Sequence, residues 1–120
     1  MYINDSAFDA ALNWIKANGL RLDICSAEPA TYAGVAAVSL GNKDPIAIAA
    51  PADGAVSGRK VSVPQITDGA VSADGDATFW AITNGADTLI ATGALAASQT
   101  VTNGNTFTLA AFDVTFLDAA

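Results

Sequence analysis

Asparagine or aspartate followed by glycine occurs six times in this sequence, and the five pairs that follow Asn18-Gly19 divide much of it into short segments. Such pairs tolerate the positive φ angles of tight hairpin turns, because glycine has no Cβ and the short polar side chains bond nearby backbone. Alternating apolar runs lie between these turn signals, as in all-β sandwiches and barrels. We therefore expect a mainly β fold, an antiparallel β-sandwich or barrel-like domain. The five pairs are Asp53-Gly54, Asp68-Gly69, Asp74-Gly75, Asn84-Gly85 and Asn103-Gly104.

The clearest segment is a hairpin over residues 77–95, ATFWAITNGADTLIATGAL. Two apolar runs flank Asn84-Gly85, a pair that favours a tight hairpin turn. The run FWAI (79–82) is apolar on both faces. A strand of this kind is central in its sheet, or its outer face is covered by a helix or another subunit. We expect Trp80 to be the core residue whose truncation destabilises the fold most.

Several other segments have the alternation of β-strands. Pro64 cannot donate a hydrogen bond to a sheet, so its segment is expected at an edge or with a bulge. In the last segment, an extra residue at Ala110-Ala111 resets the alternation, as a β-bulge does. The segments are 20–25, 35–40, 46–50, 58–66 and 105–118.

One segment has the helical period, residues 6–18, SAFDAALNWIKAN. Asp5 or Ser6 is expected to cap it, and Gly19 to end it in the left-handed conformation. The helix is too short to be stable alone, so it must lie on an apolar surface. We expect one domain over residues 1–120, with an N-terminal helical segment at 1–19 and a β-domain at 20–118. Phe8, Ala11, Leu12 and Ile15 form the apolar face of this single N-terminal α-helix.

The charge balance excludes some partners and favours others. Five Lys and Arg against twelve Asp and Glu give a net charge of −7, so we expect binding neither to nucleic acid nor to an acidic membrane surface. Only 14% of residues are charged and 52% are hydrophobic, which indicates a surface partly covered by a partner or by sister copies. We expect a homo-oligomer or high-copy assembly, synthesised in a host cytoplasm because no secretory signal or long apolar segment is visible.

The residues that usually carry chemistry are scarce. There is no histidine, so a Ser-His-Asp or Cys-His site cannot form within the chain, and we expect no catalytic residues and no cofactor. Cys25 is the single cysteine and is expected to be a half-buried, small apolar residue, on the strand face that also carries Arg21 and Asp23. Three aspartates near glycine turns could suggest calcium, but they lack the EF-hand spacing and turn chemistry alone explains them, so we expect no metal site, although whether they hold a cation stays open: Asp68, Asp74 and Asp76.

Four residues are candidates for an interface. Trp14 lies off the apolar stripe of the helix and is either a contact residue or the margin of the buried face. Tyr32 lies in a predicted loop, where aromatic residues often anchor interfaces, and with Glu28 it forms the one local pair resembling a glycan site. Arg59 and Lys60 lack a phosphate-loop pattern and would also serve as charges that protect an edge strand.

Five sequence blocks, taken in their order, resemble a family of small virion-associated proteins of tailed bacteriophages and prophages. The resemblance covers roughly residues 20–118, and its most specific part is the hairpin block followed by a polar loop and Gly-Asn-Thr-Phe. It implies a structural place on the particle, on the capsid or on the tail, and it brings no catalytic residues. The blocks are LRLDICSAEPATYA (20–33), VSLGNK (38–43), GRKVSVPQITDGAV (58–71), ATFWAITNGADTLIATGAL (77–95) and VTNGNTFTLAAFDVTF (101–116).

These observations favour a non-enzymatic virion structural protein, a capsid decoration (cement) protein on the outer capsid surface. Its partners would be the phage major capsid protein, sister copies, or both. A compact acidic chain suits many identical surface positions and stays away from packaged DNA. The alternative is a tail or baseplate accessory protein that assembles with tail proteins and itself binds a host-surface glycan. A small hydrolase is a third class, disfavoured by the missing base.

Overall fold

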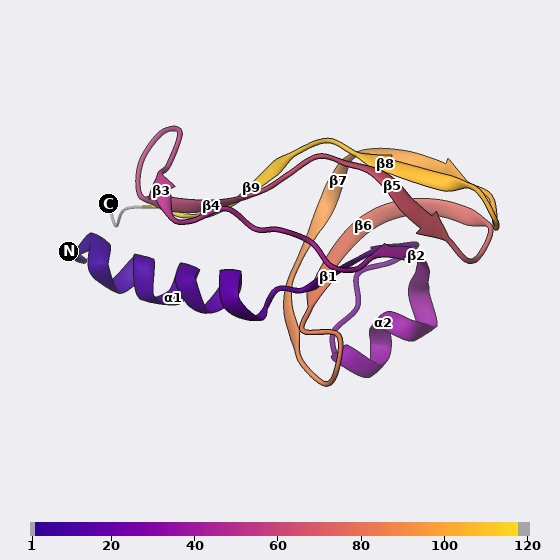
Figure 1. Ribbon diagram of the computed structural model, residues 1–120, viewed down its shortest axis with the longest axis horizontal. Helices are drawn as coiled ribbons and strands as arrows, with labels where there is room; N and C mark the ends of the chain where they lie inside the picture. The colour runs from indigo at the N-terminus through magenta and orange to yellow at the C-terminus, as the bar shows by residue number, and fades with distance from the viewer. Residues whose placement is uncertain (1, 118–120) are drawn as a thin grey trace.

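The computed structural model describes residues 2–117, and the predicted boundaries at residues 1 and 118–120 lie outside that range. The molecule is elongated, with extents of 46 × 27 × 23 Å. Helix α1 and a small sheet form one end, and a curled sheet with helix α2 forms the other (Figure 1). The helices are α1 (Asp5–Asn18) and α2 (Tyr32–Val38), and the strands are β1 (Arg21–Cys25), β2 (Ser39–Lys43), β3 (Ala52–Asp53), β4 (Arg59–Val63), β5 (Ile66–Val71), β6 (Gly75–Thr83), β7 (Leu89–Val101), β8 (Thr106–Leu109) and β9 (Phe112–Phe116).

The larger sheet has six antiparallel strands in the order β7-β6-β1-β2-β5-β8 and curls into a half-barrel. The predicted mainly β, antiparallel, barrel-like fold is therefore confirmed. Strand β6 lies between β7 and β1. It is therefore an interior strand of the sheet, as predicted from its two apolar faces. The β6–β7 turn is held by Asn84, whose Oδ1 accepts hydrogen bonds from the backbone N–H groups of Ala86, Asp87 and Thr88 at 2.9–3.0 Å.

The smaller sheet has three strands in the order β3-β4-β9. Strand β4 leads into β5 and strand β8 leads into β9, so two long ribbons run side by side from one sheet to the other (Figure 1). The C-terminal segment therefore contains two strands in different sheets, and Ala110-Ala111 is the connection between them. The bulge predicted there was wrong, because the change of alternation marks the passage from one sheet to the other.

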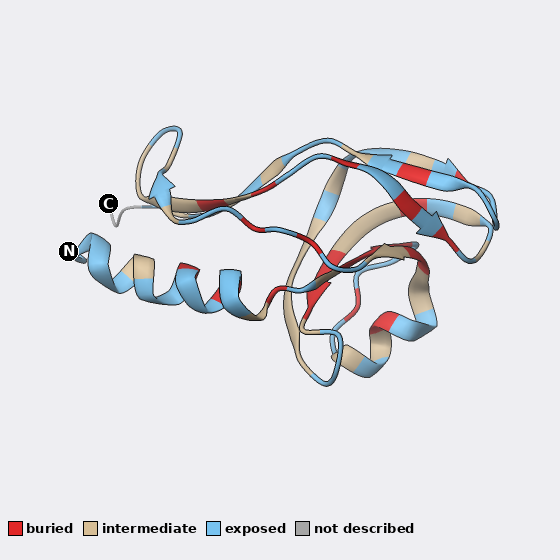
Figure 2. Ribbon diagram, in the orientation of Figure 1, coloured by how far each residue is buried: buried red, intermediate tan, exposed pale blue. Residues whose placement is uncertain are grey.

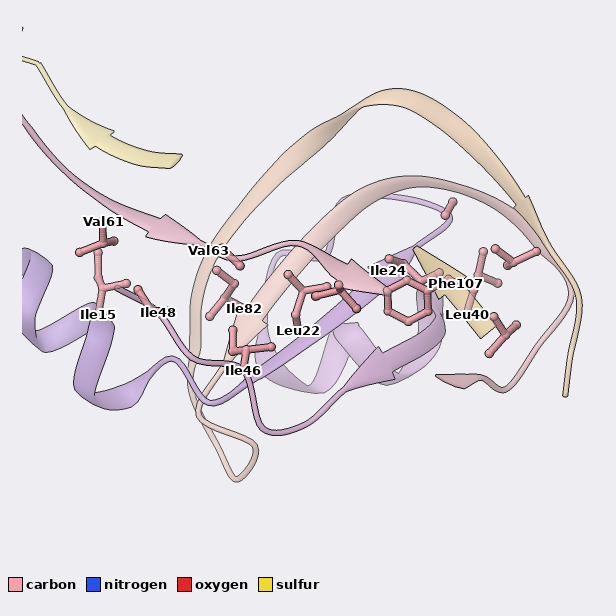
Figure 3. Close-up of a cluster of buried hydrophobic side chains, with 14 of the residues drawn as sticks. Ile15, Leu22, Ile24, Leu40, Ile46, Ile48, Val61, Val63, Ile82 and Phe107 are labelled. Atoms are coloured by element: carbon pink, nitrogen blue, oxygen red, sulfur yellow. The ribbon is translucent and has the colours of Figure 1, made fainter. Parts of the chain in front are cut away.

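One apolar core joins both sheets and α1. It runs from Ile15, Ile48 and Val61 at one end to Phe107 at the other, beneath the curled sheet (Figure 3). In Figure 2 the buried residues gather along this line, while most of α1 is exposed. Phe107, which is 1% exposed, lies directly over Gly69, where a Cβ would collide with the aromatic ring. Gly69 thus gives β5 the space for the largest fully buried side chain.

The ends of α1 differ from the prediction. The helix begins at Asp5, and Asn4 caps it with its side chain, which accepts a hydrogen bond from the Ser6 N–H at 2.8 Å. Gly19 has φ −77°, so it does not adopt the left-handed conformation. A Cβ at Gly19 would lie 2.7 Å from both the Ile15 carbonyl oxygen and the Ile48 side chain. The glycine is therefore required by close packing at the helix end.

A second helix, α2, replaces the predicted strand at 35–38, so the expectation of a single helix was wrong. Thr31 caps α2 by accepting a hydrogen bond from the Gly34 N–H at 3.0 Å, and Val35 is buried. A short alanine-rich apolar run fits a helix as well as a strand, and the cap decides between them. The strand β2 begins only at Ser39.

Two other strand predictions were wrong in part. Residues 46–50 form no strand, although Ile46 and Ile48 are buried, because the backbone makes only isolated hydrogen bonds to Leu20 and Ser62. Strand β4 is the middle strand of its sheet and ends at Val63. Proline therefore follows the strand and requires neither an edge position nor a bulge.

Truncation of Phe107 should destabilise the fold more than truncation of Trp80. Trp80 is only partly buried, and its ring centroid lies 4.5 Å from that of Phe112. We therefore no longer expect Trp80 to be the residue whose truncation destabilises the fold most. Phe107→Ala should lower the free energy of unfolding by about 3–5 kcal/mol, and Trp80→Ala by less. Urea denaturation of both variants measures this. A larger loss for Trp80→Ala would contradict the packing described here.

Candidate functional site

Trp14 and Tyr32, two of the predicted interface residues, lie in different parts of the structure. Trp14 lies on the outer side of α1 and is 52% exposed, next to the buried positions Leu12 and Ile15. Tyr32 is the first residue of α2 and lines a pocket beside β1. The carboxylate of Glu28 accepts a hydrogen bond from Thr92 Oγ1 at 3.1 Å and is not among the pocket-lining residues. The suggested pair of Tyr32 with Glu28 therefore does not form that pocket.

Arg59 and Lys60 hold elements of the protein together. Arg59 donates hydrogen bonds to Asp9 on α1 at 2.8 Å and to Asp53 on β3 at 2.6 Å, and these acceptors raise its pKa further. Lys60 donates to Asp113 on β9 at 3.0 Å. Because β4 is a middle strand, neither cation guards a sheet edge. Their role in an interface stays a prediction.

The three turn aspartates are each engaged separately. Asp68 bonds Lys43 at 2.9 Å, and this contact lowers the pKa of the Asp68 carboxyl. Asp74 accepts a hydrogen bond from the backbone of Asn103, and Asp76 accepts one from the Thr100 hydroxyl, both at 2.7 Å. Asp68 lies inside β5, so the turn predicted at Asp68-Gly69 was wrong. Within residues 2–117 no three His, Cys, Asp or Glu side chains gather where they could hold a metal ion.

Cys25 is fully buried, which corrects the expectation of a half-buried residue. It packs in a small cluster with Val35 of α2 and Ala81 of β6. Burial, assisted by the neighbouring charge of Asp23, raises the pKa of the Cys25 thiol to about 12. The thiol is therefore protonated at neutral pH and is a poor nucleophile.

A polar pocket of about 360 Å³ lies where β1, β2 and the end of β6 meet α2. Side chains from strands, a helix and a loop converge on it, although they lie far apart in the sequence. It is lined by Arg21, Asp23, Tyr32, Ala33, Val35, Ala36, Ser39, Asn42, Ser72 and Thr83.

The pocket contains a charged pair with a fixed geometry. Asp23 is only 1% exposed, and its two oxygens accept hydrogen bonds from Arg21 Nε at 2.9 Å and Arg21 Nη2 at 3.2 Å. The Ser39 hydroxyl donates a third hydrogen bond to Asp23 at 2.7 Å. The bond to Asp23 raises the pKa of Arg21 above its ordinary value. The two side chains form a bidentate ion pair whose charges largely cancel each other.

Three more lining residues have side-chain polar groups that are free to bind a ligand. Among the hydrogen bonds of residues 2–117, none involves the side chains of Tyr32, Asn42 or Ser72. The sequence predicted one part of this site, because the alternation along β1 places Arg21 and Asp23 on the same face of the strand. The sequence gives no further signal for the site, because its other walls come from α2 and β2, whose boundary was predicted wrongly.

Comparisons with protein-family models, with curated protein sequences and with solved structures find no match to this chain. Neither α1 nor α2 is long and apolar enough to span a membrane, and the search covered residues 2–117. The functional argument therefore depends on the geometry and chemistry described above.

The buried thiol gives a first test of the site description. Cys25→Ser should lower the free energy of unfolding by about 1–3 kcal/mol, because the new hydroxyl enters an apolar cluster. In the folded protein, iodoacetamide should leave Cys25 unmodified, while a Ser98→Cys variant carries one reactive thiol at an exposed position. Rapid modification of Cys25 under native conditions would show that the thiol is accessible.

Acid should weaken the contact between β4 and β9. Hydrogen bonds from Ser62 and then Lys60 hold the pKa of Asp113 below its ordinary value of 3.8. A carboxyl with a lowered folded-state pKa stabilises the fold above its unfolded pKa, and this stability is lost as the pH falls through the folded pKa. Because the pair is partly exposed, the contribution should be at most about 1 kcal/mol.

Denaturation with urea between about pH 5 and pH 2 measures this effect. The wild type should lose stability more steeply over this range than Asp113→Asn. Ser62→Ala should also reduce the slope, because it removes the strongest cause of the shift. Equal slopes in all three proteins would refute the assignment.

Proposed function

We propose that this protein is a non-enzymatic structural subunit of a tailed-phage virion, present in many copies on the outer surface of the capsid. Its sequence blocks support the virion assignment through their resemblance to small virion-associated proteins. One structural observation supports a role in assembly. The strand at one edge of the half-barrel, β7, is long, uncharged and unpaired on its outer side.

Strand β7 lies at the end of the strand order, and within residues 2–117 its pairing partner is β6 alone. Residues 88–112 contain no charged side chain, although the chain has five Lys and Arg and twelve Asp and Glu. Exposed edge strands present free N–H and C=O groups, and charged residues commonly protect them from pairing. Strand β7 itself carries no such charge, and the Glu28 carboxylate that reaches it is held by Thr92 Oγ1 at 3.1 Å, so the strand's backbone is suited to accept another strand.

The part of β7 best suited to pairing is residues 91–94, which pair with β6 in an unbroken register. The β6–β7 register moves from Ala77↔Gln99 to Phe79↔Ala94, so residues 95–98 bulge out and interrupt the edge. A second, smaller irregularity lies at Ile82/Thr83. Bulges end strand pairing and so define which part of the edge is available.

The most suitable partner of this edge is a sister copy. Two chains that each carry −7 repel one another, and contact through an uncharged strand brings the fewest like charges together. Antiparallel pairing of β7 with β7 would also be self-complementary, as symmetric interfaces require.

Helix α1 offers a separate surface for the major capsid protein. Only Leu12 and Ile15 of its residues are buried, and Trp14 is exposed on its outer side. Tryptophan is enriched among residues that dominate interface energies. The helix therefore provides attachment to the particle, while β7 connects neighbouring copies.

The second candidate is a tail or baseplate accessory protein that contacts the host surface. Tyr32 favours it, because this residue lies at a polar pocket and not within the core. Purified protein added to particles that lack it separates the two locations. Many copies on heads support the capsid assignment, and binding to isolated tails but not to heads would overturn it.

A charge placed on the edge should prevent assembly. Ala94 is exposed and pairs with Phe79, so Ala94→Lys puts a cation on β7 without filling the core. We expect the variant to keep its stability within about 0.5 kcal/mol and to lose about tenfold or more in self-association and in binding to particles. Sedimentation of the protein alone and with particles measures both.

Ala86→Lys is the matched control, because Ala86 is exposed in the β6–β7 turn and the same charge is added there. This variant should assemble like the wild type. Loss of assembly in both variants would indicate a general charge effect, and normal assembly of Ala94→Lys would exclude β7 as the interface.

A further inference from the structure

We propose that the pocket between β1, β2 and α2 binds one ring of a neutral carbohydrate. The inference stands apart from the capsid assignment, since it uses none of the residues of the β7 edge or the exposed face of α1. The pocket's size, its charge balance and its free polar groups lead to this ligand class.

The size of the pocket fits a small ligand. A volume of about 360 Å³ is near the lower end of the range for small-molecule sites, which is roughly 300–1,000 Å³. One sugar ring can occupy such a space. Hydrogen bonds from Arg21 and Ser39 already fix the Asp23 side chain in the pocket. Binding a ligand therefore does not carry the entropic cost of ordering that side chain.

The charges around the pocket favour a neutral ligand. Arg21 and Asp23 form a bidentate pair that cancels within the site. Asp44 lies near enough to act on the Arg21 charge and adds a negative charge, and the whole chain carries −7. An anionic ligand would be repelled, and a metal ion would find no group of three ligating side chains within residues 2–117.

The free polar groups match the hydroxyls of a sugar. Tyr32 and Ser72 each carry a hydroxyl that can donate and accept, and the Asn42 amide offers both a donor and an acceptor. Arg21 keeps Nη1 free, because its bonds to Asp23 use Nε and Nη2. Sugar hydroxyls also donate and accept, so several of them can be satisfied at once.

One wall of the pocket is apolar and comes from α2. It consists of Ala33, Val35 and Ala36, beside the aromatic ring of Tyr32. A sugar ring has an apolar C–H face in addition to its hydroxyls. Such a face packs on alanine and tyrosine while the hydroxyls point to the polar strand side.

Backbone amide NMR of the full chain, titrated with methyl glucoside, methyl galactoside and N-acetylglucosamine, tests the proposal. Saturable shifts are expected for at least one sugar at Ala33, Asn42 and Ser72, with affinity in the millimolar range and no shifts around Asp53, which lies on β3 in the small sheet and does not line the pocket. Separate titrations with sodium acetate and with sodium phosphate test whether the pocket binds an anion instead of a sugar. Saturable shifts with an anion and with no sugar would overturn the proposal, and so would the absence of saturable shifts with every compound.

Two variants identify the contacts. Asn42→Ala should weaken binding about tenfold, and Tyr32→Phe by less, because it removes one hydroxyl and keeps the ring. Asn105→Ala is the matched control, since Asn105 is exposed in the β7–β8 connection and does not line the pocket. The spectrum of each variant shows whether it is folded. If the folded Asn42→Ala and Asn105→Ala variants bind as the wild type does, the pocket is not the site.

Discussion

The structure depends on the burial of both faces of β1. This strand pairs with β2 on one side and β6 on the other, so its backbone is satisfied within the sheet. Leu22 and Ile24 face the core inside the half-barrel, and they are at most 1% exposed. Asp23 and Cys25 on the opposite face are equally buried. A sheet with two buried faces needs a cover on each, and the second cover is α2.

The same constraint creates the polar pocket. The helix α2 contributes Val35 to the cluster around Cys25, and the apolar contact there is tight. Towards the start of β1 the buried residue is Asp23, which requires hydrogen-bond partners and obtains them from Arg21 and Ser39. Polar residues therefore gather along this part of the sheet, and a space remains beside the helix. At the other end of the molecule, α1 is attached by apolar packing of Leu12 and Ile15 and by the bond of Arg59 on β4 to Asp9, while the bond of Arg59 to Asp53 joins β4 to β3.

The sequence predicts the local elements of this fold better than its site. Asn84-Gly85 between alternating apolar runs is sufficient to predict the β6–β7 hairpin, and the period of residues 6–18 is sufficient for α1. The apolar runs at 35–40 and 46–50 were misassigned, because short runs of alanine, valine and isoleucine fit a helix, a strand or buried irregular chain. The pocket could not be predicted, because residues from Arg21 to Thr83 meet there only through tertiary packing. Tyr32 was identified as a contact candidate, but its suggested partner Glu28 bonds Thr92 instead.

The central claim is that the uncharged edge of β7 connects this chain to its neighbours in a particle. Amide hydrogen exchange, measured on the isolated protein and on the protein bound to virions, tests it directly. Free N–H groups on an edge strand exchange quickly, and pairing with another strand protects them. The account predicts that exchange slows by about tenfold or more on the particle at those amides of residues 91–94 that point away from β6. Unchanged exchange at the outward-pointing amides of residues 91–94, with protection appearing only elsewhere in the chain, would contradict it.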